Sequence, residues 1–379
     1  MQIDLDLLIN VLLALVAALI MSFAATPVVK TFANKVGAID RPDEERRVHD
    51  HPIPRMGGLA IFLGFLLSVV LFADITRPVQ GILLGAVLIV VVGAIDDIVS
   101  LPAGVKFIMQ IIAALIAVYH GVVIEFIMNP FFAGSDVFTT ADTISMGFLS
   151  IPITVLWIVA ITNSVNLIDG LDGLAVGVSA IDSVTMLVIS LVVAEGNIAV
   201  ILAALAGACI GFMPYNLNPA KIFMGDTGAL LLGYVLSTVS IMGLFKFYAV
   251  VSFAVPFLVL AVPIFDTAFA FCRRILKGQN PMRADRGHFH HRLIDMGLSQ
   301  KHAVAILYCV STIMGLAAVL LATENTMKAL VLVATFIIAG VIGMFVMRDK
   351  LNAARLAASE EQKTKSSKTK SREVPDGKS

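Results

Sequence analysis

Charged residues are scarce in this sequence. Only 14% of its 379 residues are Asp, Glu, Lys or Arg, whereas a soluble globular domain carries about 25%. Hydrophobic residues make up 58%, and the mean hydropathy is +0.93. This composition excludes an ordinary soluble protein. The 27 basic and 27 acidic residues balance, so no excess of positive charge favours a nucleic-acid partner, and none is expected.

Cysteine is also rare, which limits the kinds of stabilising site. The three cysteines, Cys209, Cys272 and Cys309, are far apart in the sequence and fall in apolar stretches. This spacing provides neither a disulfide framework nor a zinc site. We expect all three to be buried small hydrophobic residues.

Long apolar runs make up most of the sequence. A helix that crosses a bilayer needs roughly 17–25 mostly apolar residues, because its backbone must form its hydrogen bonds internally. Eleven such runs predict an all-α polytopic membrane protein with about eleven transmembrane helices. The runs cover residues 5–29, 57–74, 79–95, 104–123, 148–165, 173–194, 197–214, 227–245, 249–272, 303–323 and 326–347.

The distribution of Lys and Arg orients these spans. With the N-terminus outside and the C-terminus in the cytoplasm, 24 of the 27 Lys and Arg residues fall on the cytoplasmic side, where positive charge accumulates. The external loop 124–147 should form a short hairpin or lie on the membrane surface. We expect a membrane domain over residues 1–350 and a disordered, basic cytoplasmic tail over residues 351–379. The cytoplasmic loops would be 30–56, 96–106, 163–172, 215–226 and 273–302.

Six aspartates lie where the predicted spans end at the cytoplasmic face. They are Asp96, Asp97, Asp169, Asp172, Asp226 and Asp266. A single carboxylate at a helix end is usually a cap or a solvated charge, but six on one face favour a shared cation. Carboxylate and amide oxygens suit Mg²⁺ or Mn²⁺, with phosphate oxygens of a substrate completing the shell. The sequence therefore predicts a metal-dependent phosphoryl-transfer site.

Polar residues recur at a fixed spacing in the loop 163–172. Asn163, Asn166, Asp169 and Asp172 repeat every three residues, so neighbouring members would share one face of a helix. The alternative is an Asn/Asp/Gly-rich turn between two spans. The spacing favours a functional face over a simple turn.

The loop 273–302 contains a histidine tract. His288, His290 and His291 fall within four residues, close to Arg286. Such a tract can bind a metal, or it can supply acid, base or phosphate-binding groups near neutral pH. We favour phosphate binding, because arginine grips phosphate oxygens well and no soft ligand lies nearby to complete a zinc site.

The segment before the second span has two prolines and paired glycines. Pro52 and Pro54 keep the chain extended, and Gly57 and Gly58 permit tight packing at the membrane surface. Basic residues that only orient the neighbouring spans would explain the charges of this segment but not its prolines and paired glycines.

Taken together, these motifs resemble the polyprenyl-phosphate N-acetylhexosamine-1-phosphate transferases. Members of that family move a sugar 1-phosphate from a UDP-sugar to a membrane polyprenyl phosphate, release UMP and require Mg²⁺. The resemblance implies the same substrates, a bilayer location and an active site on the cytoplasmic face of the plasma membrane. It covers about residues 30–345 and rests on Asp96–Asp97, Asn163–Gly173, Phe223–Gly228 and His288–His291.

The resemblance also implies roles for individual residues. Asp226 and Asn166 would hold Mg²⁺, for which Mn²⁺ could substitute, while Phe223 would stack on uracil. Asp172 would contact the uridine and Lys106 the pyrophosphate. The expected catalytic residues are Asp96, Asp97, Asp226 and His290. The expected substrate-binding residues are Lys106, Asn163, Asp169, Asp172, Asn216, Phe223, Arg286, His288 and His291. The individual roles of Asp169 and Asp266 in the cluster stay open.

Several alternatives stay open. The segment Pro52–Gly58 and the tract His288–Leu293 resemble the branch that uses UDP-GlcNAc and undecaprenyl phosphate, rather than the branch that uses UDP-MurNAc-pentapeptide. The rival from another class is an ion-coupled transporter, which needs charges near the middle of the membrane instead of at the ends of spans. Transfer can proceed by direct in-line attack or through a covalent aspartyl intermediate. A homodimer is neither required nor excluded.

Overall fold

The computed structural model describes most of the chain. Its described residues are 4–40, 52–128, 143–193, 195–243, 254–276, 278, 288–323 and 325–339. Arg286 and the tail 351–379 therefore lie outside the described residues. Residues 1–329 form one compact unit and residues 330–379 a second, of which the described part is helical.

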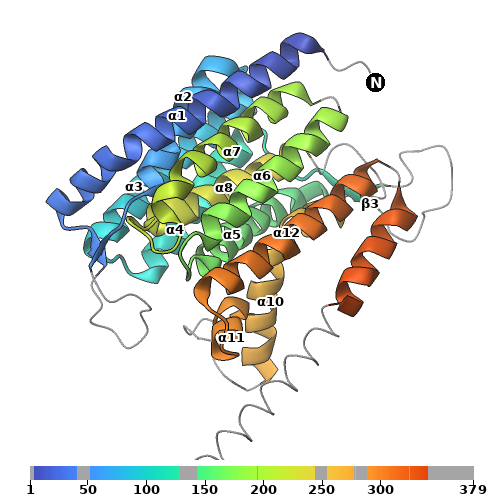
Figure 1. Cartoon of the computed structure of the whole chain (residues 1–379). Coiled ribbons are helices and arrows are strands. Elements are labelled where there is room, and N and C mark those ends of the chain that lie inside the picture. The colour runs from blue at the N-terminus through green and yellow to red at the C-terminus, as the bar shows by residue number, and fades with distance from the viewer. Residues whose placement is uncertain are drawn as a thin grey trace, which may run out of the picture. The chain divides into compact units, whose positions relative to one another are not determined.

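Helices make up nearly all of the described structure, which confirms the all-α class (Figure 1). Short β-strands and a 3₁₀ turn at Gly147–Leu149 complete it. The helices are α1 Leu5–Val36, α2 Gly58–Phe72, α3 Arg77–Val99, α4 Ala103–Tyr119, α5 Ser150–Ile168, α6 Leu174–Val192, α7 Gly196–Asn216, α8 Gly225–Gly243, α9 Ala254–Val259, α10 Ala261–Leu276, α11 Phe289–Asp295, α12 Gln300–Ala322 and a last helix, Thr326–Ala339.

Seven of the described helices are long and apolar enough to cross a bilayer, so the chain is a multi-pass membrane protein. They are α1, α3, α5 with its preceding turn, α6, α7, α8 and α12. The helices α2, α4 and Thr326–Ala339 are apolar but shorter. The count of eleven spans and the sides of the two termini stay predictions.

The predicted span over residues 249–272 is interrupted. Its described part forms two helices, α9 and α10, which meet at Leu260. Pro263 is the third residue of α10, within the first turn, where its missing N–H leaves no intrahelical bond unmade. The two prolines of this region, Pro256 and Pro263, thus flank the break.

Two short hairpins join helices. Strands β3 Phe126–Met128 and β4 Thr143–Ser145 pair antiparallel, with Ile127 opposite Ile144, so of the two arrangements expected for the loop 124–147 the structure shows the hairpin. Strands β1 Ile39–Asp40 and β2 Ile53–Pro54 pair in the same way and bring the end of α1 next to the start of α2.

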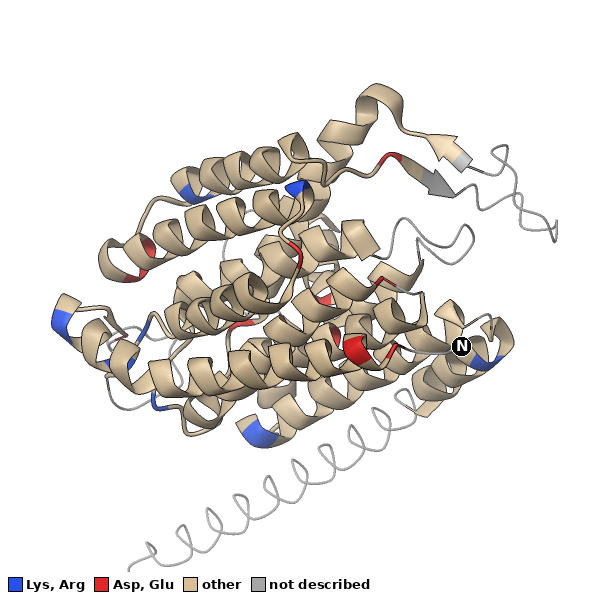
Figure 2. Cartoon of the chain, turned by 90° about the horizontal axis from the view of Figure 1, so that it is seen from above, with Lys and Arg blue, Asp and Glu red and all other residues tan. Residues whose placement is uncertain are grey.

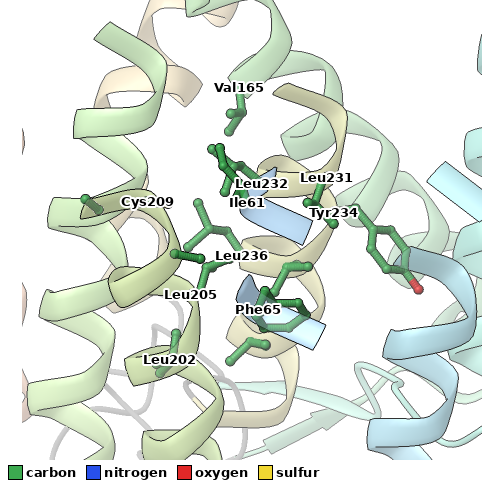
Figure 3. Close-up of a cluster of buried hydrophobic side chains, with 14 of the residues drawn as sticks. Ile61, Phe65, Val165, Leu202, Leu205, Cys209, Leu231, Leu232, Tyr234 and Leu236 are labelled. Atoms are coloured by element: carbon green, nitrogen blue, oxygen red, sulfur yellow. The ribbon is translucent and has the colours of Figure 1, made fainter. Parts of the chain in front are cut away.

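Helix α8 is the most enclosed element of the bundle. Every one of its residues except Asp226 and Met242 is buried. A helix that is apolar on all sides must be surrounded by other helices, and α2, α3, α5, α6 and α7 all contact it. Figure 3 shows part of this core, with side chains of Ile61, Phe65, Val165, Leu202, Leu205, Leu231, Leu232 and Leu236 gathered together.

Charge is rare along the described ribbon, as Figure 2 shows. One acidic residue, Asp182, nevertheless lies at the middle of α6 and is only 1% exposed. The expectation that the informative acidic residues lie at the ends of spans overlooked it. The cysteines also differ from expectation: Cys209 is buried, but Cys272 and Cys309 are exposed on the surfaces of α10 and α12.

Candidate active site

The first turn of α8 is held by a carboxylate from another helix. Asp97, in the last turn of α3, accepts hydrogen bonds from the backbone nitrogens of Asp226 (3.0 Å) and Thr227 (3.1 Å). It also accepts a bond of 2.6 Å from Thr227 Oγ1. The first N–H groups of a helix lack intrahelical acceptors, and a carboxylate there also suits the helix dipole. Asp97 thus fixes the position of Asp226.

The segment that precedes α2 docks on the same turn. The backbone nitrogens of Gly57 and Gly58 donate to the carbonyls of Phe223 (2.9 Å) and Met224 (2.8 Å), and Phe223 donates to Pro54 O (2.8 Å). A Cβ built at Gly58 would lie 2.0 Å from the nitrogen of Gly228, so only glycine fits there. These contacts explain why the sequence needs extended prolines followed by paired glycines.

Two carboxylates converge on one ammonium group. Lys106, in the first turn of α4, places Nζ 2.8 Å from Asp226 Oδ2 and 3.0 Å from Asp96 Oδ2. Asp96 Oδ1 also accepts from the backbone of Leu101 (2.6 Å), which closes the α3–α4 turn. Asn166 Nδ2 lies 3.3 Å from Asp226 Oδ1. Residues from four helices therefore meet at Asp226.

The oxygen atoms at this point are of the kind that Mg²⁺ takes. Asp96 and Asp226 each direct an oxygen at the Lys106 cation, and the Asn166 amide lies on the other side of Asp226. Hard oxygen ligands of this type, with phosphate oxygens and water completing the shell, fit Mg²⁺. Among the described residues, no three or more His, Cys, Asp or Glu side chains lie close enough together to hold a metal ion by themselves. Magnesium stays a prediction.

The three-residue series is helical at first and then becomes a turn. Asn163 and Asn166 lie in the last turns of α5, Asp169 follows its end, and Asp172 lies in the turn before α6. Both interpretations of the spacing therefore apply, each to part of the series. Asn163 pairs with Gln110 of α4, with Nδ2 2.5 Å from Gln110 Oε1.

Asp172 and Asn216 brace the loop that leads into α8. Asp172 Oδ2 accepts from Asn218 Nδ2 (2.9 Å) and from the backbone nitrogen of Ala220 (3.0 Å). Asn216 is buried, accepts from Gly173 N (3.2 Å) and donates to Ile222 O (3.0 Å). In this structure both side chains join the α6 start to the segment before Asp226.

Asp169 has an unusual electrostatic environment. Burial raises the pKa of its carboxyl to about 7, and the negative charge of Asp226 acts in the same direction. The positive charge of Arg55 opposes part of this rise in the pKa. Asp169 can therefore change its charge near neutral pH.

The histidine tract lies beside the turn that follows α5. His290 is 2% exposed, and its ring stacks on that of His288 at a centroid distance of 5.8 Å. A Cβ built at Gly170 would lie 2.4 Å from His290 Nε2. Burial, reinforced by the neighbouring His291, lowers the pKa of His290 to about 4, so this ring is neutral at pH 7.

Comparison with known proteins identifies the family. A sequence profile of glycosyl transferase family 4 matches residues 79–244, which include Asp96, Lys106, Asn166 and Asp226. The chain is 40% identical, over 334 residues, to a probable undecaprenyl-phosphate N-acetylglucosaminyl 1-phosphate transferase of Bacillus subtilis; the match covers 87% of this chain and 90% of the relative. The chain belongs to glycosyl transferase family 4.

Two further relatives of this family 4 member carry different names. A decaprenyl-phosphate N-acetylglucosaminephosphotransferase of Mycolicibacterium smegmatis is 36% identical over 328 residues, with 78% of each chain covered. A phospho-N-acetylmuramoyl-pentapeptide-transferase of Staphylococcus aureus is 32% identical over 275 residues, covering 69% of this chain and 83% of the relative.

The structure of this family 4 member brings the expected residues into two groups. One group surrounds Asp226, and the other joins the turn 169–172 to the histidine tract. The first contains Asp96, Asp97, Lys106, Asn163, Asn166 and Asp226, with Phe223 three residues before Asp226. Arg286 lies outside the described residues.

Sequence reasoning missed several partners of these residues. Gln110 lies one helical turn after Lys106, at a spacing that could have placed both on one face of α4. Asn218 and Thr227 each follow a predicted site residue by one or two positions. The partner of Asp266 had no such local signal: its Oδ2 lies 2.8 Å from His288 Nδ1, across 22 residues of sequence.

Proposed function

We propose that this chain transfers N-acetylglucosamine 1-phosphate from UDP-N-acetylglucosamine to undecaprenyl phosphate, releasing UMP. The observation that carries the proposal is the meeting of Asp96, Lys106 and Asp226, where one ammonium group lies within 3.0 Å of two carboxylates. Phosphoryl transfer depends mostly on positioning and electrostatics. This arrangement provides both.

The choice of N-acetylglucosamine as the transferred sugar rests on sequence identity to named relatives. The relatives named for N-acetylglucosamine are 40% and 36% identical to this chain, whereas the relative named for the N-acetylmuramoyl-pentapeptide is 32% identical over a shorter region. These figures support the N-acetylglucosamine substrate. Phospho-N-acetylmuramoyl-pentapeptide transfer is the second candidate.

Asp226 and Asn166 would hold Mg²⁺, through a carboxylate and an amide oxygen. Bound there, Mg²⁺ would neutralise charge on the diphosphate oxygens of the donor. Lys106 would bind the same diphosphate from the α4 side, and Asp97 would keep Asp226 in place. Asp96 would orient Lys106 and face the incoming lipid phosphate.

The reaction follows from the chemistry of its two substrates. The second pKa of a phosphate monoester is about 6, so the lipid phosphate is mostly dianionic at pH 7 and needs little help to lose a proton. An oxygen of this phosphate attacks the phosphorus that bears the sugar, and the bond to the UMP oxygen breaks. The Lys106 ammonium stabilises the charge that develops on the departing UMP.

The location of the site follows from the solubility of the substrates. The lipid acceptor cannot leave the bilayer, whereas the nucleotide sugar is water-soluble. The excess of Lys and Arg in the predicted cytoplasmic loops supports a site at the cytoplasmic face of the plasma membrane.

UMP release tests the proposal. Purified protein would be given undecaprenyl phosphate and a panel of UDP-sugars, with Mg²⁺ or with EDTA. UMP should appear with UDP-N-acetylglucosamine and Mg²⁺, and it should disappear in Asp226→Asn. Asp74→Asn, an exposed carboxylate outside the site, serves as the matched control. No UMP from any UDP-sugar would overturn the proposal.

The path of the transfer has its own test. Direct in-line attack inverts the configuration at the transferred phosphorus, whereas a covalent aspartyl intermediate retains it. A donor that is chiral at this phosphorus would distinguish the two. We expect inversion.

A further inference from the structure

Asp266 and His288 form a buried pair that the proposed reaction does not yet use. Asp266 lies on α10 and His288 immediately before α11, so the pair joins the start of α11 to α10 (Figure 1 labels both helices). Asp266 Oδ2 lies 2.8 Å from His288 Nδ1, and each residue is 5% exposed. The other carboxylate oxygen, Oδ1, accepts a hydrogen bond from the backbone nitrogen of Phe289. Both oxygens are therefore engaged.

This contact determines which nitrogen of His288 carries a proton. A carboxylate accepts hydrogen bonds, so the ring nitrogen that faces it must be the donor. The proton then sits on Nδ1, which leaves Nε2 as the ring atom available to another group.

The position of the pair links it to the rest of the site. The ring of His288 stacks on that of His290, with 10° between the planes. The Nε2 atom of His290 in turn packs against Gly170. Gly170 directly follows Asp169 and begins the turn that leads to Asp172. The orientation of His288 therefore bears on the region where the sugar phosphate of the donor would lie.

We propose that Asp266 is a positioning residue that fixes His288 with a proton on Nδ1, so that the unprotonated Nε2 accepts a hydrogen bond from a hydroxyl group of the sugar in the sugar-phosphate donor. The inference rests on the proposed function for the identity of the ligand. Its structural part, the protonated nitrogen, does not depend on that function.

A purely structural role for Asp266 makes a different prediction. Its bond to Phe289 holds the start of α11, and a residue that served only this purpose could be replaced by asparagine. In Asp266→Asn the amide oxygen can still accept from Phe289. The amide nitrogen would then face His288 Nδ1 as a donor and force the proton to Nε2. The substitution thus removes the acceptor that faces His288 but keeps the acceptor for the Phe289 N–H.

Nitrogen-15 NMR of histidine-labelled full-length protein in detergent tests the structural part. The His288 signals are assigned by their loss in His288→Gln. In the wild type we expect the shifts of a ring protonated at Nδ1, and in Asp266→Asn those of a ring protonated at Nε2. The control Asp295→Asn changes an exposed carboxylate at the end of α11 and should leave the signals unchanged. A wild-type ring with a bare Nδ1, or an unchanged ring in Asp266→Asn, overturns the inference.

UMP release tests the consequence for the reaction. Loss of an outer partner of this kind typically lowers activity about 10- to 100-fold. We expect a fall of that size in kcat for Asp266→Asn, with a smaller change in KM for UDP-N-acetylglucosamine. In a His288→Gln background the same substitution should have no further effect, because the residue acts through His288. Wild-type kcat in Asp266→Asn, or independent effects of the two substitutions, would overturn the positioning role.

The two assays also separate this inference from the proposed function. If the wild type released no UMP from any donor, the proposed function would fail, yet the NMR result would still report on the Asp266–His288 pair. If the wild type released UMP normally and Asp266→Asn kept both its activity and its ring signals, only the inference would fail.

Discussion

Asp97 holds the backbone of Asp226 from a different helix, with Oδ1 3.0 Å from the Asp226 nitrogen. The two residues are separated by 129 positions in the sequence. The carboxylate of Asp97 is thus committed to the start of α8, whereas the neighbouring carboxylate of Asp96 faces Lys106. The adjacent aspartates have different partners, so their substitution should have different consequences.

Replacing Asp97 with Asn should destabilise the protein and lower its activity. The amide keeps one acceptor oxygen but turns a donor toward the N–H and O–H groups of the α8 start. Leaving such a buried donor unsatisfied costs about 1–3 kcal/mol. Thermal unfolding in detergent would show the loss. Asp96→Asn is the matched variant and should lose UMP release with a smaller change in melting temperature. Equal melting temperatures for Asp97→Asn and the wild type would show that Asp97 does not stabilise the start of α8.

Gly58→Ala should prevent the segment before α2 from docking on α8. The added Cβ would lie 2.0 Å from the Gly228 nitrogen and 2.1 Å from its Cα, both backbone atoms that cannot rotate away. Overpacking of this kind costs about 1–3 kcal/mol or more. Gly104→Ala in α4 is the control, since a Cβ there meets nothing within 4 Å. We expect reduced yield of folded protein for the first variant and normal yield for the second. A normal yield and melting temperature for Gly58→Ala would show that the helices can separate without cost.

The apolar runs and the shared face of Asn163 and Asn166 could be predicted from sequence because each depends on local pattern. A bilayer forces helices on any long apolar run, and a three-residue spacing places Asn163 and Asn166 on one face whatever surrounds them. A hairpin was one of the two arrangements expected for the loop 124–147. These features need no knowledge of tertiary packing.

Other features depend on which helix lies beside which. The sequence shows Asp96 and Asp97 as equivalent. Only the packing of α3 on α8 distinguishes Asp97, which binds the start of α8, from Asp96, which faces Lys106. The pairing of Asp266 with His288 likewise requires α10 to lie beside α11. The break at Leu260 could be suspected from Pro256 and Pro263 but not located.

Asp169→Asn should stabilise the protein at alkaline pH and have a smaller effect at acidic pH. Its pKa of about 7 lies above the ordinary value of 3.8, so the folded state binds the proton more tightly than the unfolded state. Stability from this group is therefore full below pH 3.8 and declines as the pH rises toward 7. An asparagine carries no charge at either pH and avoids that decline.

The measurement is a pair of thermal melts in EDTA and detergent, at pH 5 and pH 8. The melting temperature of Asp169→Asn should exceed that of the wild type at pH 8, and the difference should shrink at pH 5. A constant difference at the two values would mean that Asp169 does not titrate in this range.

Asp182→Asn should be tolerated, although the residue lies in the middle of α6. Asp182 Oδ1 accepts a hydrogen bond of 2.8 Å from Ser311 of α12, and its Oδ2 has no hydrogen-bond partner among the described residues. Asparagine keeps the acceptor for Ser311 and brings no charge into the apolar bundle, where an unpaired charge is costly. We therefore expect full UMP release and a melting temperature equal to or above that of the wild type. Ser311→Ala, which removes the bond between the helices, should cost about 0.6 kcal/mol. A loss of UMP release in Asp182→Asn with a normal melting temperature would contradict this prediction and would show that the reaction needs the ionisable group.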